Sequence, residues 1–176
     1  LDDKSSPAAV RRILEGPDGY DKGLWSEMAA MGWTGASIPE ELGGAGLSRL
    51  DAAIIFEALA YGDVPVTAYL TIHNMATWMV TRFARPEVAA EWGPRLTSGE
   101  MLASYCLTEP GAGSDAASLA TRARREGGHY VLDGTKAFIS GAGATGALVV
   151  MARTGEAGPK GISAFLVAAD GPGISY

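Results

Sequence analysis

The sequence Tyr-Cys-Leu-Thr-Glu-Pro-Gly-Ala-Gly-Ser-Asp, residues 105–115, decides how the rest of the chain is interpreted. It begins inside a short apolar segment, residues 103–107, that predicts a strand. The strand should end before Pro110, because proline has no amide hydrogen to donate to a sheet. Gly111 and Gly113 can adopt positive φ and let the backbone come close to a ligand. Such a loop can direct several amide N–H groups at phosphate oxygens, although the proline and glycines alone are more typical of an ordinary turn.

Composition excludes several classes of function. The chain has 176 residues, of which 47% are hydrophobic, so it can hold one domain or two small ones. Its net charge is −6 and its basic residues are scattered, which argues against nucleic-acid binding. No apolar run approaches the ~18 residues that span a bilayer, so no membrane insertion is expected. The single cysteine, Cys106, cannot form an internal disulfide and favours a reducing compartment.

The first part of the chain, residues 1–102, has the pattern of a helical domain. The expected helices cover residues 7–14, 21–31, a segment after Ser48, residues 66–84 and residues 86–96. Ser48 and Asp51 have the spacing of a capping box. The helix at 66–84 is apolar on more than one face, so we place it between other helices. Near its middle, His73 and Asn74 are interpreted either as a hydrogen-bonded pair in the bundle or as residues that border a substrate cavity.

The second part, residues 103–176, has the pattern of strands. Expected strands cover residues 103–107, 119–125, 129–132, 135–140, 148–153 and 162–168, with hairpin signals at residues 127–128 and 133–134. Residues 171–176 are typical of the start of another strand, so we expect this domain to be incomplete at its C-terminal end. His129 stands without other clustered ligands, so no metal site is expected. Residues 141–146 fit G-x-G-x-x-G, but a strand follows rather than a helix, which argues against a dinucleotide site.

Residues 105–115 resemble the flavin-binding signature of the acyl-CoA dehydrogenase family. Residues 134–141, Gly-Thr-Lys-Ala-Phe-Ile-Ser-Gly, resemble the second flavin segment of that family, and the Ile-Pro-Glu-Glu-Leu-Gly-Gly loop at 38–44 resembles a loop between its early helices. The resemblance implies an α+β fold, with an all-α N-terminal domain at 1–102 and an antiparallel, barrel-like β domain at 103–176. It also implies that a C-terminal four-helix bundle is missing from this chain.

The resemblance implies a set of FAD-binding residues. The Thr108 hydroxyl would bond the pyrimidine edge of the flavin, and Ser114 would contact both the pyrophosphate and the acyl-CoA substrate. Ser140 would donate to flavin N5, or else it merely ends a strand. The implied cofactor-binding residues are Tyr105, Leu107, Thr108, Gly113, Ser114, Phe138, Ile139 and Ser140. The catalytic glutamate is expected in the missing bundle, so none is assigned here, and Glu109 is expected to hold the loop.

The implied activity is FAD-dependent α,β-dehydrogenation of an acyl-CoA thioester. Residues 72–75, 138–143 and 158–163 most resemble the isobutyryl-CoA branch, which favours a short or branched acyl group. Electrons would pass to an electron-transferring flavoprotein, and the full-length protein would be a homotetramer or homodimer. It would lie in the bacterial cytoplasm, or in the mitochondrial matrix of a eukaryote. The alternatives are a flavin oxidase or monooxygenase of the same fold and a non-catalytic acyl-CoA-binding scaffold.

Overall fold

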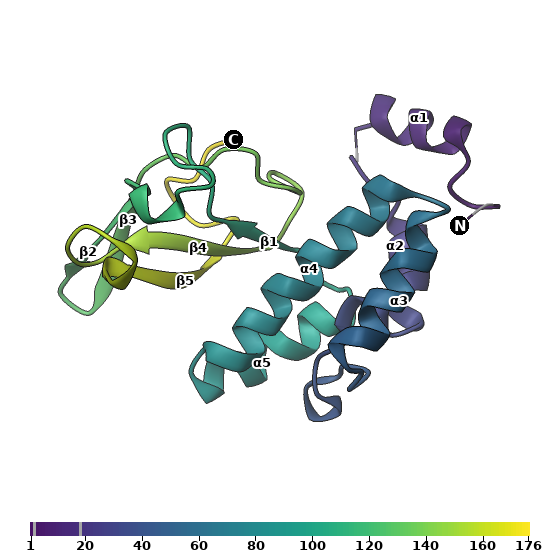
Figure 1. Ribbon diagram of the computed structural model, residues 1–176, viewed down its shortest axis with the longest axis horizontal. Helices are drawn as coiled ribbons and strands as arrows, with labels where there is room; N and C mark the ends of the chain where they lie inside the picture. Colours follow the sequence, from purple (N-terminus) through teal and green to yellow (C-terminus); the bar gives the residue numbers. More distant parts are fainter. Residues whose placement is uncertain (2, 18) are drawn as a thin grey trace. The chain divides into compact units, whose positions relative to one another are not determined.

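The computed structural model describes Leu1, residues 3–17 and residues 19–176. The chain divides into two compact units, Leu1–Ala103 and Ser104–Tyr176. The first unit is helical, and the second is built on a sheet (Figure 1). The expected α+β class, with a helical part followed by a sheet part, is therefore confirmed.

The helices of the first unit lie close to the predicted ranges. They are α1 (Pro7–Glu15), α2 (Lys22–Ala30), α3 (Arg49–Ala60), α4 (Val64–Phe83) and α5 (Pro86–Thr97), with the 3₁₀ turns η1 (Trp33–Gly35) and η2 (Glu40–Leu42) between α2 and α3. Within the described residues, no helix has the length and apolar character needed to cross a membrane.

Local capping explains where α3 and α4 begin. At α3 the predicted capping box is present: the Asp51 amide donates to Ser48 Oγ at 3.2 Å, and the Ser48 amide donates to the Asp51 carboxylate at 3.1 Å. Helix α4 begins two residues earlier than predicted. The Asp63 carboxylate accepts a hydrogen bond from the Val66 amide at 2.9 Å, and Pro65 is tolerated because it falls in the first turn.

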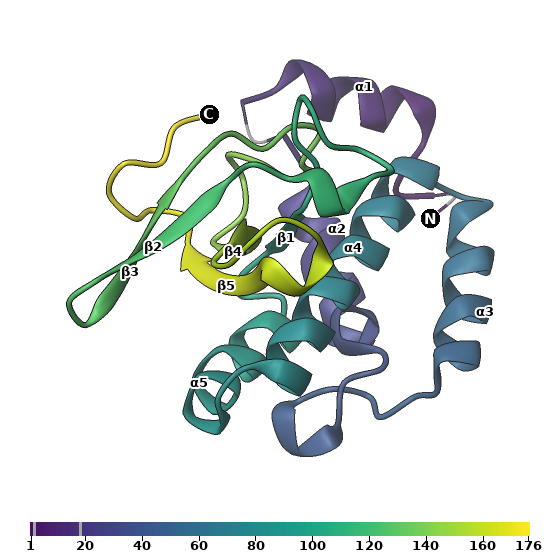
Figure 2. The same cartoon turned by 60° about the vertical axis from the view of Figure 1, so that its left-hand side comes forward.

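Helix α4 packs against both α3 and α5, as its apolar faces predicted (Figures 1 and 2). His73 on α4 is fully buried. Its Nδ1 accepts a hydrogen bond from the Ala103 amide at 3.1 Å, so its Nε2 must carry the proton that is donated to the Leu96 carbonyl at 3.0 Å. Burial lowers the pKa of His73 to about 4, although the Leu96 bond raises it, so the ring is neutral at pH 7.

The neighbouring Asn74 is also buried and also bonded to the backbone. Its Oδ1 accepts from the Ala36 amide at 3.0 Å, and its Nδ2 donates to the carbonyls of Trp33 at 2.8 Å and Leu70 at 3.0 Å. Asn74 therefore fastens the segment around η1 to α4. The interpretation that both side chains are hydrogen-bonded inside the bundle is correct, but their partners are backbone groups.

The strands of the second unit form a mixed sheet. They are β1 (Ala103–Cys106), β2 (Arg122–Glu126), β3 (His129–Asp133), β4 (Ala147–Arg153) and β5 (Ile162–Ala168). The order is β1-β4-β2-β3, and β5 also pairs with β4. The pairs β2–β3 and β4–β5 are antiparallel, whereas β2 pairs with β4 in parallel at Arg122 and Arg153. The expectation of an antiparallel domain therefore needs correcting at the β2–β4 pairing.

Two local predictions in this unit are wrong. Residues 135–140 were expected to form a strand, but no strand lies between β3 and β4. Residues 133–134 do not make a hairpin either, because a long connection leads to β4, which lies beside β2 rather than β3. Gly134 serves a different purpose: its φ is +155°, and a Cβ there would lie 2.4 Å from Thr121 Oγ1. The other hairpin signal, residues 127–128, does join β2 to β3.

Candidate functional site

The loop after β1 is closed by its own backbone. The Glu109 amide donates to the Ala112 carbonyl at 3.0 Å, and the Ala112 amide donates to the Glu109 carbonyl at 3.1 Å. This pair of bonds places Pro110 and Gly111 at the tip of a tight turn. Pro110 fits there because its position needs no amide donor.

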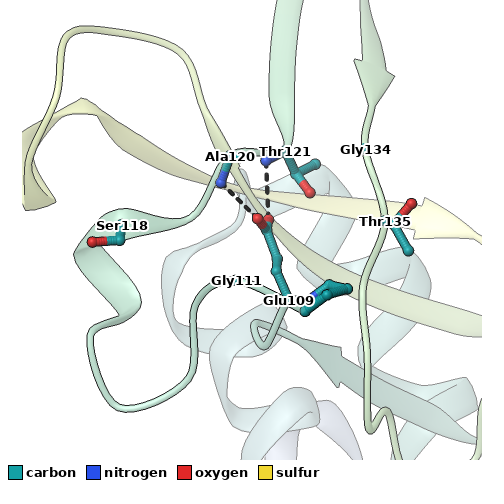
Figure 3. Close-up of a pocket in the computed structure, with 8 residues that line it drawn as sticks. Glu109, Gly111, Ser118, Ala120, Thr121, Gly134 and Thr135 are labelled. Carbon is teal, nitrogen blue, oxygen red and sulfur yellow. Dashed lines mark hydrogen bonds between the residues drawn. The ribbon is translucent and has the colours of Figure 1, made fainter.

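The Glu109 side chain anchors this loop to the segment before β2. Its carboxylate accepts hydrogen bonds from the amides of Ala120 at 2.6 Å and Thr121 at 3.0 Å (Figure 3). The Lys136 ammonium donates to the same carboxylate at 2.7 Å. Burial alone would raise the pKa of Glu109, but the Lys136 bond and the two amides outweigh it and lower the pKa to about 2. Glu109 is therefore ionised and held, in agreement with the role expected for it.

The segment 134–141 lies directly against the loop. The Ala137 amide donates to the Thr108 carbonyl at 2.9 Å, and Lys136 Nζ donates to the Leu107 carbonyl at 2.9 Å. At the other end, the buried Ser104 hydroxyl on β1 donates to the Ser140 carbonyl at 2.6 Å. The structure thus brings together two stretches of sequence that are about 30 residues apart.

Phe138 stands at the centre of this segment in an unusual conformation. Its φ is +56°, and it is the only non-glycine residue with positive φ in the described part of the chain. Its side chain is 95% exposed. A bulky residue at positive φ costs free energy, and the exposed Phe138 ring gains no burial that would offset this cost. An exposed ring on such a strained backbone suits a flat apolar ligand that stacks on it.

The remaining predicted residues differ in how far they are exposed to solvent. Tyr105 is on β1 and half-buried, and burial raises its pKa. Ile139 is half-buried, whereas Ser114 and Ser140 are exposed. The side chains of Ser114 and Ser140 are therefore accessible to a ligand.

Gly113 differs from the expectation. Neither Gly111 nor Gly113 has positive φ, and a Cβ at either position would meet nothing within 4 Å. The need for an unusual backbone conformation at Gly113 is therefore not supported. What remains is open space beside an exposed loop, which a closely approaching ligand could fill.

Residues that the sequence interpretation did not single out hold the site together. Ser104 and Lys136 make the cross-links described above, and Thr121 lies against Gly134 in a hollow of about 370 Å³ (Figure 3). Arg153 on β4 donates to the carbonyls of Ala117 at 2.7 Å and Leu119 at 3.0 Å, which fixes the chain just after Ser114. The one signal that could have been used is Lys136, a charged residue in an otherwise uncharged segment.

Comparison with known proteins identifies the family. Residues 3–100 match the model of the acyl-CoA dehydrogenase N-terminal domain, and residues 104–176 match that of the middle domain. The chain is 51% identical over 158 residues to isobutyryl-CoA dehydrogenase, mitochondrial, of Dictyostelium discoideum, and 53% identical over 148 residues to that of Bos taurus. These alignments cover 89% and 84% of this chain but only 38% and 36% of the relatives, so the chain spans less than two fifths of their length.

Solved structures with a similar fold point to the same family. The structure of PigA with FAD and proline has a TM-score of 0.88 at 31% identity, covering 98% of this chain and 45% of that one. Glutaryl-CoA dehydrogenase from Mycobacterium smegmatis in complex with FADH2 has a TM-score of 0.81 at 28% identity, covering 96% and 45%. The prolyl acyl carrier protein oxidase AnaB has a TM-score of 0.80 at 29% identity, covering 88% and 42%. Together with the two family models, these similarities show that the chain belongs to the acyl-CoA dehydrogenase family.

Proposed function

We propose that the full-length protein is an FAD-dependent dehydrogenase that forms an α,β double bond in a short or branched acyl-CoA, with isobutyryl-CoA as the first substrate to test. Identities of 51% and 53% to proteins named isobutyryl-CoA dehydrogenase support this substrate. The FAD and FADH2 complexes among the similar structures support the cofactor.

The observation that carries the proposal is the strained, exposed Phe138 on a segment fixed to the loop at residues 105–115. Three hydrogen bonds hold that segment, through Ala137, Lys136 and the Ser140 carbonyl. The ring therefore has a fixed backbone and a free face. These residues fit a flavin, because an isoalloxazine is flat and needs hydrogen-bond partners along its polar edge.

Each predicted residue receives a role in this proposal. The backbone of Tyr105, Leu107 and Thr108 lines the ring, and the Thr108 hydroxyl bonds its pyrimidine edge. Gly113 and Ser114 reach the pyrophosphate, and Ser114 also contacts the acyl-CoA. Phe138 and Ile139 flank the isoalloxazine, and Ser140 donates to N5.

When bound, the flavin supplies the redox chemistry by accepting a hydride equivalent from Cβ of the acyl group. The residues of this chain orient the substrate and cofactor and place a hydroxyl where negative charge develops. The proton at Cα requires a carboxylate base. Glu109 is not that base, since its carboxylate is already bonded to two amides and to Lys136.

The same proposal covers partners, domains and location. Electrons pass to an electron-transferring flavoprotein, and the full-length protein is a homotetramer or homodimer. The helical domain covers residues 1–102 and the β domain residues 103–176. Relatives named as mitochondrial support the matrix of a eukaryote, and a bacterial protein of this kind would work in the cytoplasm.

A second candidate is an oxidase of the same fold, which the similarity to the prolyl acyl carrier protein oxidase favours. An oxidase would pass electrons to oxygen rather than to a flavoprotein. A non-catalytic acyl-CoA-binding scaffold is the remaining alternative, and it would show no turnover with any acyl-CoA.

Anaerobic titration of the full-length protein with isobutyryl-CoA tests the proposal. We expect a flavin absorption spectrum that bleaches on addition of substrate and recovers slowly in air. Rapid recovery in air would favour the oxidase. A protein that carries flavin but does not bleach with any short acyl-CoA would favour the scaffold, and a protein without flavin would overturn the proposal.

A further inference from the structure

We propose that the Glu109–Lys136 ion pair is a positioning element that holds the flavin-lining backbone in place and sets how easily the flavin is reduced. This inference rests on the proposed flavin site. It assigns a function to two charged side chains that touch neither the cofactor nor the substrate in the roles described above.

The pair is buried and links three parts of the β unit. The Glu109 side chain is 6% exposed and that of Lys136 is 12% exposed, and their charged atoms are 2.7 Å apart. Lys136 also donates to the Leu107 carbonyl, and Glu109 accepts from the amides of Ala120 and Thr121. The segment before β2 is therefore connected through Glu109 and Lys136 to the backbone at Leu107.

This connection fixes two of the residues whose backbone is proposed to line the flavin ring. The Leu107 carbonyl is held by Lys136, and the adjacent Thr108 carbonyl is held by the Ala137 amide, the next residue along the segment. Lys136 thus stands one residue from one flavin-lining contact and two residues from Phe138. A shift of its ammonium group would move both sides of the site together.

The two charges act on this backbone with opposite signs. The Lys136 ammonium donates to the Leu107 carbonyl directly, whereas the Glu109 carboxylate accepts from the amides of Ala120 and Thr121. Of the two charges, the positive one is therefore bonded to the backbone that is proposed to line the ring. A buried positive charge favours the electrons added on reduction, and a buried negative charge opposes them.

The two single substitutions should change how easily the flavin is reduced in opposite directions. In Lys136→Met, the unpaired Glu109 carboxylate should make the flavin harder to reduce. In Glu109→Gln, the unpaired ammonium should make it easier to reduce. We expect the ratio of reduced to oxidised flavin at a fixed potential to change by about three- to tenfold in each case. The double variant should lie near the wild type, and Lys136→Arg, which keeps the charge, should shift the ratio least among the substitutions at Lys136.

The test is an anaerobic redox titration of the full-length holoprotein and these variants, followed by flavin absorbance. Lys4 and Glu27 form an exposed ion pair, so Lys4→Met and Glu27→Gln are matched controls that should leave the ratio unchanged. A merely structural pair would shift both single variants in the same direction or not at all, and either result would overturn the inference.

The same set of variants also distinguishes a failure to fold or to bind the cofactor from a failure of the inference. If Lys136→Met does not fold, Glu109→Gln and the double variant still give the sign, because neither leaves a buried carboxylate unpaired. If the wild type itself binds no flavin, the proposed function fails. If the wild type binds flavin and the variants do not shift as stated, only this inference fails.

Discussion

Replacing Phe138 with glycine should raise the free energy of unfolding and lower the affinity for FAD. A residue other than glycine in the left-handed region costs roughly 1–2 kcal/mol, and glycine removes that cost. Glycine also gains freedom in the unfolded chain, which costs roughly 0.5–1 kcal/mol. Because the Phe138 side chain is 95% exposed, its removal loses little buried area. We therefore expect Phe138→Gly to raise the free energy of unfolding of the FAD-free protein by roughly 0–1.5 kcal/mol.

Flavin affinity should change in the opposite direction. An aromatic contact is worth roughly 0.5–1.5 kcal/mol beyond its buried area, so FAD should bind at least about two- to tenfold more weakly. Urea unfolding of the FAD-free protein and fluorescence titration with FAD give the two quantities. Tyr61 is a matched control because it is 88% exposed but has a φ of −63°, so Tyr61→Gly should destabilise the fold and leave FAD binding unchanged. A Phe138→Gly protein that is less stable than the wild type, or that binds FAD equally well, would refute this reasoning.

Three further predictions concern the same fold and site. Because burial holds the pKa of His73 at about 4, below its unfolded value near 6.5, the unfolded state binds more protons. The free energy of unfolding should therefore have its full value above pH 6.5 and be lower by about 2 kcal/mol at pH 5. In urea unfolding, His73→Gln should abolish this dependence on pH. Glu109, with a pKa of about 2, should add a further loss only as the pH falls below ~4.5. Gly113→Val should weaken FAD binding, as measured by titration, but should leave the free energy of unfolding unchanged, because a Cβ at this position meets nothing within 4 Å. Unchanged FAD binding together with a changed free energy of unfolding would contradict this. Ser140→Ala should slow anaerobic reduction by the substrate by about ten- to a hundredfold, and an unchanged rate would remove Ser140 from the mechanism.

The helical unit could be predicted well because its signals are local. The capping box at Ser48 and Asp51 fixes the start of α3 from residues that are three positions apart. The apolar faces of the segment that became α4 indicated a helix between neighbours, which is what is observed. The bonding partners of His73 and Asn74 could not be predicted, because they are backbone groups brought close only by the packing of α4.

The β unit could be predicted less well because its pairings join distant residues. Residues 135–140 have the composition of a strand, but Phe138 has a φ of +56°, and the amide of Ala137 donates to the carbonyl of Thr108 in the loop. The parallel pairing of β2 with β4 depends on the course of the whole connection after β3. Likewise, Gly134 looks like part of a hairpin in the sequence, and only the structure shows Thr121 lying against it.

The family could be identified from the sequence because its two flavin-binding motifs are long and specific. The way the two motifs lie against each other could not be predicted, since it depends on the hydrogen bonds that Ser104, Lys136 and Ala137 make across the unit. These three residues bond backbone carbonyls, which any residue provides. Lys136 also pairs with the Glu109 side chain in the opposite segment, but the same segment offers Asp115 as another acidic partner, so the sequence alone does not select the contact.

The most direct test of the central claim is a crystal structure of the full-length protein with FAD. The account predicts that the isoalloxazine lies against Phe138 at van der Waals distance, about 4 Å, and that Ser140 Oγ lies about 3 Å from N5. The Leu107 and Thr108 backbone should lie along the same ring, with Lys136 still bonded to the Leu107 carbonyl. A flavin bound elsewhere, with Phe138 left in solvent, would contradict it.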